Sequence, residues 1–178
     1  QLYNTLVRLD TDLDISPDLA KNWSISGDGL IYTFNLREDV YFHDYSFLKN
    51  RKLNANDVVF SLERLTDPNI ASPGSWTMNY VKSIRALDEL TVQIELKRNF
   101  PAFLGILSMK YCSVLPKEVA DGSIDFRTNP IGTGPFYFKN WVPKEKLVFR
   151  KNPLYFEKDS LGVQLPYLEA VAITFLPD

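Results

Sequence analysis

His43 and Asp44 are the adjacent side chains that most resemble a proton-transfer pair. Adjacent residues of a strand point to opposite faces, however, which argues against a shared proton. His43 is the only histidine and Cys112 the only cysteine, so we expect no zinc or copper site, and no disulfide can form within the chain. We therefore predict a buried, hydrogen-bonded histidine or one that caps a turn.

Other catalytic arrangements are also incomplete. No Gly-x-Ser-x-Gly motif is present, and a single histidine would have to serve every hydroxyl and Cys112. The paired acids Asp88-Glu89 and Glu118 with Asp121 stand in turns and on exposed helix positions, where a solvated surface is the expected role. We predict no catalytic residue, no metal ligand and no cofactor.

Gly132-Thr133-Gly134 is the nearest match to a phosphate-binding loop. Such a loop needs a helix N-terminus behind it, whose free N–H groups meet the anion. Here Pro135 and an aromatic strand pattern follow, which favours a structural turn.

Trp76 stands in the loop 70–79, among serine, proline and glycine. A large aromatic residue in such a loop either covers the core or contacts a ligand or partner, and both interpretations remain open. It is the best single site candidate that the residues alone provide.

Composition excludes several classes of protein. The chain has 178 residues, of which 45% are hydrophobic and 24% charged, as in an ordinary globular protein of one domain or two small ones. The formal net charge is -2 without a basic stripe, so nucleic acid is not an expected partner. No apolar run approaches the ~20 residues of a membrane span.

Because the chain starts at Gln1 without a signal peptide, we expect an excised piece, whose missing signal says nothing about location.

The elements that must position these residues are mixed α and β, with strands in the majority. In the stretch 17–44, a Gly-Asp-Gly turn precedes strict alternation, which predicts a hairpin or meander. Asn54, with Asp57 three residues later, predicts a capped helix through Leu65. Further predicted strands are 2–9, 30–36, 40–43, 81–87, 91–96, 136–141, 146–150 and 168–175, and short helices are expected after Pro101 and before Gly122.

Several motifs in this order resemble the family-5 extracellular solute-binding proteins of bacterial ABC importers. They are Pro17-x-Leu19-Ala20-x-x-Trp23, Asp28-Gly29-x-x-Tyr32-Thr33-Phe34, Val40-x-Phe42-His43-Asp44, Asp57-Val58-Val59-Phe60-Ser61-Leu62, Leu115-Pro116-Lys117 and Gly132-x-Gly134-Pro135-Phe136. Asp67-Pro68-Asn69-x-Ala71-Ser72-Pro73 resembles the oligopeptide-binding members in particular. The chain departs from the family at Tyr45, which replaces a glycine, and in a longer polar insert, 46–51.

The resemblance implies a fragment of a two-lobed binding protein of mixed α+β, periplasmic-binding-protein type II-like fold, made of a strand-rich subdomain and part of the first lobe. Residues 1–127 would form a family-specific extra subdomain, and 128–178 the start of a return segment into the first lobe. By analogy with the family, Ser75, Trp76 and Tyr80 are the expected ligand-binding residues.

The same resemblance implies the function. The longer protein would be the substrate-binding component of an ABC importer, not an enzyme, and would capture oligopeptides or similar small solutes for permease subunits in the membrane. It would be a monomer in the periplasm or at the outer face of the cytoplasmic membrane, where a lipoprotein anchor can hold it.

Two other classes of function stay open. A fragment of a carbohydrate-active or other extracellular hydrolase would show two convergent carboxylates about 5–10 Å apart in a cleft. A chaperone-like or protein-interaction module would show a contiguous apolar patch of several hundred Å².

Overall fold

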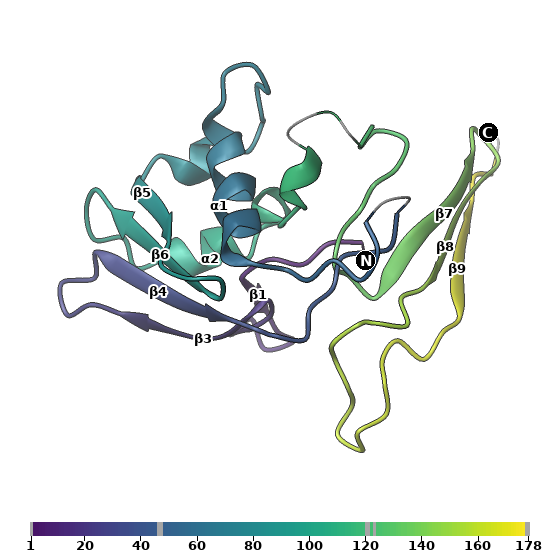
Figure 1. The fold of residues 1–178 in the computed structure, drawn as a ribbon, viewed down its shortest axis with the longest axis horizontal. Helices are drawn as coiled ribbons and strands as arrows, with labels where there is room; N and C mark the ends of the chain where they lie inside the picture. The colour runs from purple at the N-terminus through teal and green to yellow at the C-terminus, as the bar shows by residue number, and fades with distance from the viewer. Residues whose placement is uncertain (1, 46–47, 120–121, 123, 177–178) are drawn as a thin grey trace. The chain divides into compact units, whose positions relative to one another are not determined.

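The computed structural model describes residues 2–45, 48–119, 122 and 124–176 (Figure 1). These form two compact units. Residues 4–38 and 53–117 make the first, called here the sheet–helix unit, and residues 1–3, 39–52 and 118–178 make the second, called the hairpin unit. The expected mixed α+β class is confirmed. The boundary between 127 and 128 concerns the lobes of a longer protein and stays a prediction.

An antiparallel four-stranded sheet is the centre of the sheet–helix unit. Its order is β3 (Ala20–Ile25), β4 (Ile31–Leu36), β6 (Thr91–Leu96) and β5 (Val81–Ala86). The predicted turn at Gly27-Asp28-Gly29 and the predicted strand 30–36 are confirmed, and Gly29 has a φ of +73°. The hairpin partner is β3, which was not among the predicted strands. Alternation in β4 buries Tyr32, Phe34 and Leu36. The predicted strands 81–87 and 91–96 are confirmed as β5 and β6.

Helix α1 (Ala55–Glu63) packs against β5 and β6. The predicted capping box is present: the Asn54 side chain accepts the N–H of Asp57 at 3.3 Å, and the Asp57 carboxylate accepts the N–H of Asn54 at 2.9 Å. Asp57 also accepts the N–H of Lys117 at 3.1 Å, so this cap joins the helix to a distant segment. The predicted last turn is a 3₁₀ helix, η1 (Arg64–Thr66).

We expect Asn54→Ala to lower the free energy of unfolding by about 1 kcal/mol, because two helix N–H groups lose their acceptor. Urea denaturation followed by circular dichroism measures this. Asn56→Ala is the matched control, since Asn56 is an exposed residue of the same helix turn and alanine favours helix there. Equal effects of the two substitutions would contradict the assigned role of the cap.

The rest of this unit consists of short elements. Strands β1 (Val7–Leu9) and β2 (Ile15–Pro17) pair with each other, and α2 (Phe103–Leu107), η2 (Ser75–Met78) and η3 (Lys110–Cys112) complete it. The predicted strand 2–9 is too long. The N–H of Thr5 bonds the Asp18 carboxylate instead of a strand partner, so the ladder starts only at Val7.

The hairpin unit contains an antiparallel sheet of β7 (Phe136–Val142), β8 (Lys146–Lys151) and β9 (Ala170–Thr174), which confirms the three predicted strands. A 3₁₀ helix, η4 (Lys117–Val119), precedes it. The predicted strand 40–43 is wrong: Tyr41 forms an isolated bridge with Lys52, while the N–H of His43 donates to a different segment. No helix within the described ranges has the length and apolar character needed to cross a membrane.

Candidate functional site

The three residues predicted from the resemblance lie on or beside η2. Ser75 and Trp76 are exposed, and 43% of Trp76 is accessible to solvent. The next two residues hold the turn in place, because Thr77 is buried with its hydroxyl donating to Gly74 O at 2.6 Å, and Met78 is buried too. The turn therefore presents Trp76 outward from a fixed base.

Tyr80 lies at the other end of the turn in an aromatic stack. Its ring is parallel to that of Phe100, with 4.1 Å between the centroids. The guanidinium carbon of Arg98 is 5.0 Å from the Tyr80 ring centre, within the range of a cation–π contact. Tyr80 O accepts the N–H of Lys97 at 2.8 Å, which fixes this end of the turn to the chain that leaves β6. Arg98 and Phe100 were not among the predicted site residues.

His43 has a structural role, as one of the two predicted alternatives states. Its Nδ1 accepts the N–H of Gly132 at 3.2 Å, and its Nε2 lies 2.9 Å from Gly134 O and donates to it. Burial lowers the pKa of His43 to about 4, so the ring is neutral near pH 7. Asp44 is exposed and accepts the N–H of Asn50 at 3.0 Å, so the adjacent pair does not share a proton.

The Gly132–Gly134 segment is a structural turn, as predicted. A Cβ at Gly132 would lie 2.0 Å from Leu2 O, and the N–H of Gly134 donates to the same oxygen at 3.0 Å. Its backbone groups therefore serve the chain itself, and β7 follows where a phosphate loop would need a helix.

The acidic and thiol groups also have structural surroundings. Asp88 caps its own turn through the N–H of Leu90, and Glu118 forms an ion pair with Arg51 at 2.9 Å, while Asp121 lies outside the described residues. Burial raises the pKa of the Cys112 thiol to about 11, which disfavours a nucleophilic thiolate. Within the described part of the chain, no three His, Cys, Asp or Glu side chains gather as metal ligands would.

Two of the cavities lined by described residues of the hairpin unit were not predicted from the sequence. One, of about 500 Å³, is lined by Phe42, His43, Asp44, Tyr137, Lys151, Asn152, Pro153, Leu154 and Glu169. The other, of about 570 Å³, is mainly apolar and is lined by Leu2, Arg127, Thr128, Pro130, Phe138, Asn140, Trp141, Leu147, Phe149 and Phe175. The alternation of aromatic residues in 136–149 is visible in the sequence. It does not reveal which face of the β7–β8 hairpin lines a cavity.

Comparison with known proteins gives the class of the molecule first. The structure of the periplasmic binding protein DppA from Helicobacter pylori, solved in complex with the peptide STSA, matches with a TM-score of 0.85 and 36% sequence identity, over 99% of this chain and 37% of that chain. The chain therefore has the fold of a type II periplasmic binding protein over the region compared.

Sequence comparison then gives the family. The description "Bacterial extracellular solute-binding proteins, family 5 Middle" matches residues 14–178. Heme-binding protein A of Haemophilus influenzae is 34% identical over 197 residues, covering 100% of this chain. The dipeptide-binding protein of Escherichia coli is 33% identical over 196 residues, covering 99% of it. The chain belongs to the family-5 bacterial extracellular solute-binding proteins, which are substrate-binding proteins.

The chain spans only part of its relatives. It covers 35% of heme-binding protein A and 36% of the dipeptide-binding protein, about a third of their length.

Proposed function

We propose that this chain is part of the substrate-binding component of an ABC importer and that the whole protein captures oligopeptides or similar small solutes for transport. The observation that carries the proposal is the likeness, over 99% of the chain, to a periplasmic binding protein in complex with a peptide. Binding without chemistry also agrees with the structural roles of His43 and Cys112 described above.

In this proposal Ser75, Trp76 and Tyr80 contact the ligand. The anchored turn supports this role, because its base is buried while Trp76 offers a large apolar surface to solvent. A peptide held mainly through main-chain hydrogen bonds can be recognised with little dependence on its side chains, and an aromatic residue adds apolar contact of the same tolerance. Closure of a second lobe, outside this chain, would exclude water from the bound peptide.

The remaining parts of the proposal concern the longer protein. Residues 1–127 are the family-specific subdomain and 128–178 start the return into the first lobe. The protein works as a monomer, in the periplasm or at the outer face of the cytoplasmic membrane, and delivers its solute to permease subunits.

Calorimetric titration of a peptide library against the full-length protein and against the 178-residue chain tests this function. We expect saturable binding by the full-length protein and weak binding by the chain alone. Mass spectrometry of the ligand that co-purifies with the full-length protein should identify a peptide or a similar small solute. Absence of peptide binding by the full-length protein would contradict the proposal.

Trp76→Ala should weaken peptide binding by about tenfold or more, as truncation of an aromatic contact residue does. Because 43% of Trp76 is exposed, the free energy of unfolding should change by less than about 1 kcal/mol. Trp141→Ala is the matched control, since this tryptophan is 56% exposed in the other unit. Unchanged affinity in Trp76→Ala would remove Trp76 from the ligand site.

A further inference from the structure

Two cations lie beside the turn that carries Trp76. The ammonium group of Lys97 donates to Asn79 O at 3.0 Å, and Arg98 stacks on Tyr80. In a 3₁₀ helix the side chains at i and i+3 eclipse each other, so Trp76 and Asn79 lie on the same exposed side of η2. The bond to the main-chain oxygen of Asn79 places the Lys97 ammonium at the C-terminal end of the turn that carries Trp76.

A third cation approaches the turn from its other end. Tyr111 packs against Gly74, where an added Cβ would lie 2.6 Å from the Tyr111 Cβ. The Lys110 ammonium is 5.8 Å from the centre of the Tyr111 ring, and Lys110 itself is exposed. The surface that these side chains form is called the basic–aromatic face: Trp76, Tyr80, Lys97, Arg98, Lys110 and Tyr111.

The segments that build this face contain no acidic residue. Residues 68–87 and 96–117 include six lysines and arginines but neither aspartate nor glutamate. Among the residues that the structure describes, no carboxylate forms an ion pair with Lys97, Arg98 or Lys110. The positive charge of the face is therefore not neutralised by its own elements.

Two acids on neighbouring elements, Glu95 and Asp28, are engaged elsewhere. Glu95, at the end of β6, accepts the Lys82 ammonium at 2.7 Å, and this hydrogen bond lowers the pKa of Glu95. Asp28, whose main-chain oxygen accepts the Asn99 amide at 3.0 Å, has its carboxylate bonded to the Ser26 hydroxyl within the β3–β4 turn. Neither carboxylate is directed by these bonds toward the basic–aromatic face.

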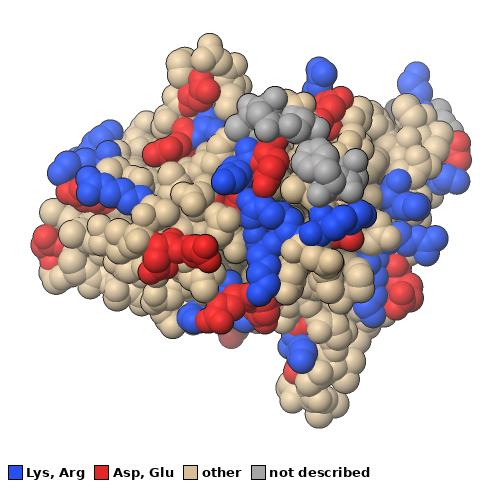
Figure 2. Space-filling view, viewed as in Figure 1, with Lys and Arg blue, Asp and Glu red and all other residues tan. Residues whose placement is uncertain are grey.

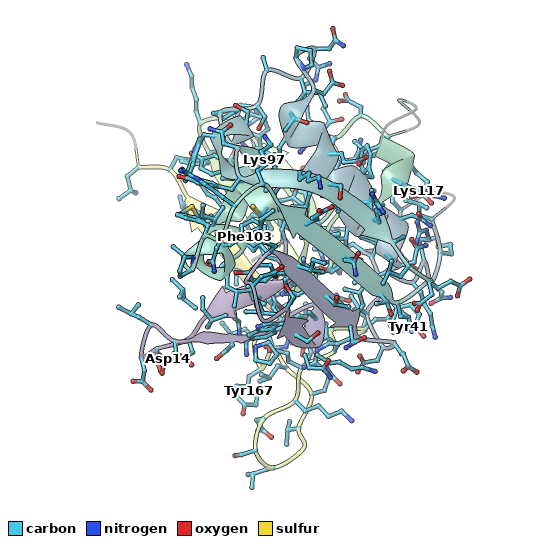
Figure 3. The ribbon with its side chains drawn as sticks, turned by 90° about the vertical axis from the view of Figure 1, so that its left-hand side faces the viewer. Asp14, Tyr41, Lys97, Phe103, Lys117 and Tyr167 are labelled. Atoms are coloured by element: carbon cyan, nitrogen blue, oxygen red, sulfur yellow. The ribbon has the colours of Figure 1, made fainter. Side chains whose placement is uncertain are left out.

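The face is open to solvent. Lys97, Arg98 and Lys110 are exposed, and Figure 3 labels Lys97 on the side of the molecule that it turns toward the viewer. Figure 2 shows Lys and Arg side chains, with Asp and Glu side chains beside them, where Figure 1 draws β5 and β6. Uncompensated cations on an open surface raise the local concentration of anions and speed their association in a salt-dependent way. Trp76 and Tyr80 supply apolar contact at the same place.

We propose that the basic–aromatic face makes the binding protein selective for peptides with acidic side chains. Trp76 stacks on the peptide, while Lys97, Arg98 and Lys110 attract its carboxylates. The inference rests on the proposed function, because it assigns the solute and these cations to the same turn.

The test measures how tightly and how fast the full-length protein binds the isosteric tripeptides Ala-Glu-Ala and Ala-Gln-Ala. Calorimetry gives the affinities and stopped-flow the association rates, each at low and at high salt. We expect Ala-Glu-Ala to bind about fivefold more tightly at low salt, a preference in the range of exposed charge pairs, and to lose most of this advantage at high salt. The charge-removing variant K97Q/R98Q/K110Q should bind both peptides equally. Lys21→Gln is the control. Lys21 lies on β3, outside the segments that form the face, and it pairs with Glu38.

The outcomes separate this inference from the proposed function. If the wild type binds both peptides equally, or if K97Q/R98Q/K110Q keeps the preference for Ala-Glu-Ala, acidic selectivity by this face is wrong while peptide binding stands. If the wild type binds neither peptide nor any member of the library, both proposals are wrong. If Lys21→Gln abolishes the preference for Ala-Glu-Ala as fully as K97Q/R98Q/K110Q does, the preference comes from the net charge of the protein, and the role of the face is wrong.

Discussion

Gly132→Ala is expected to lower the free energy of unfolding by about 3 kcal/mol or more, at the upper end of what overpacking costs. An added Cβ would lie 2.0 Å from Leu2 O and 2.6 Å from Tyr3 Cδ1. The first of these is a backbone atom, so the clash cannot be relieved by turning a side chain. Separation of the two segments would also stretch the hydrogen bonds that join Gly134 to Leu2 and Gly132 to His43.

Gly105→Ala is the matched control for this prediction. Gly105 lies in α2, and an added Cβ there meets nothing within 4 Å. Alanine favours helix over glycine by about 1 kcal/mol, so this variant should be neutral or slightly more stable. Urea denaturation of both variants measures the difference. A Gly132→Ala protein as stable as Gly105→Ala would show that the two segments do not approach each other as described.

Lowering the pH from 6.5 toward 4 should destabilise the protein through His43 by up to about 3 kcal/mol, since each unit of pKa shift corresponds to about 1.4 kcal/mol. The folded-state pKa of His43 is about 4, below the ordinary value of 6.5, because burial disfavours the imidazolium. In this window the unfolded chain binds a proton that the folded chain does not. Stability is therefore complete above pH 6.5 and decreases as the pH falls.

The hydrogen bonds of His43 give the same direction. Nδ1 accepts the N–H of Gly132, and a protonated Nδ1 can no longer accept. Nε2 keeps its bond to Gly134 O in either state. After protonation, the N–H of Gly132 and the new N–H at Nδ1 of His43 point at each other, so a hydrogen bond is replaced by two facing donors inside the hairpin unit.

Unfolding free energies of the wild type and His43→Gln, measured between pH 4.5 and 7.5, test this assignment. The variant should be less stable at pH 7 but should lose the part of the pH dependence that lies above the titration of the carboxylates. Carboxyl groups with lowered pKa, such as that of Asp10, contribute only at the acidic end. Parallel curves for the two proteins would show that His43 does not carry the pH dependence.

Much of the local structure was predictable because its signals lie within a few residues of each other. The capping box joins Asn54 to Asp57, and the alternation of β4 follows from successive side chains. The strand predicted for 40–43 failed for the opposite reason. Its alternation is real and buries Val40 and Phe42, but the backbone bonds go to separate segments, so no ladder forms.

In the candidate site, too, the local part was predictable and the contacts between distant residues were not. The resemblance indicated the turn with Ser75, Trp76 and Tyr80, and the structure places all three on or beside one exposed 3₁₀ turn. The contact of Arg98 with Tyr80 was not predictable, because it depends on how β5 pairs with β6 and where the chain leaves that hairpin.

The family, the β5–β6 and β7–β8 hairpins and the capped helix could all be predicted from the residues, because motif order, alternation and capping signals need no knowledge of distant contacts. The role of His43 became clear only from the packing of the folded chain, since its partner Gly132 is 89 residues away in the sequence. The packing of distant segments also decided that Leu2 O leaves room for no side chain at Gly132, and that Lys97 bonds Asn79 O at the end of the turn that carries Trp76. Such contacts depend on how distant segments pack, and residue spacing carries no record of that packing.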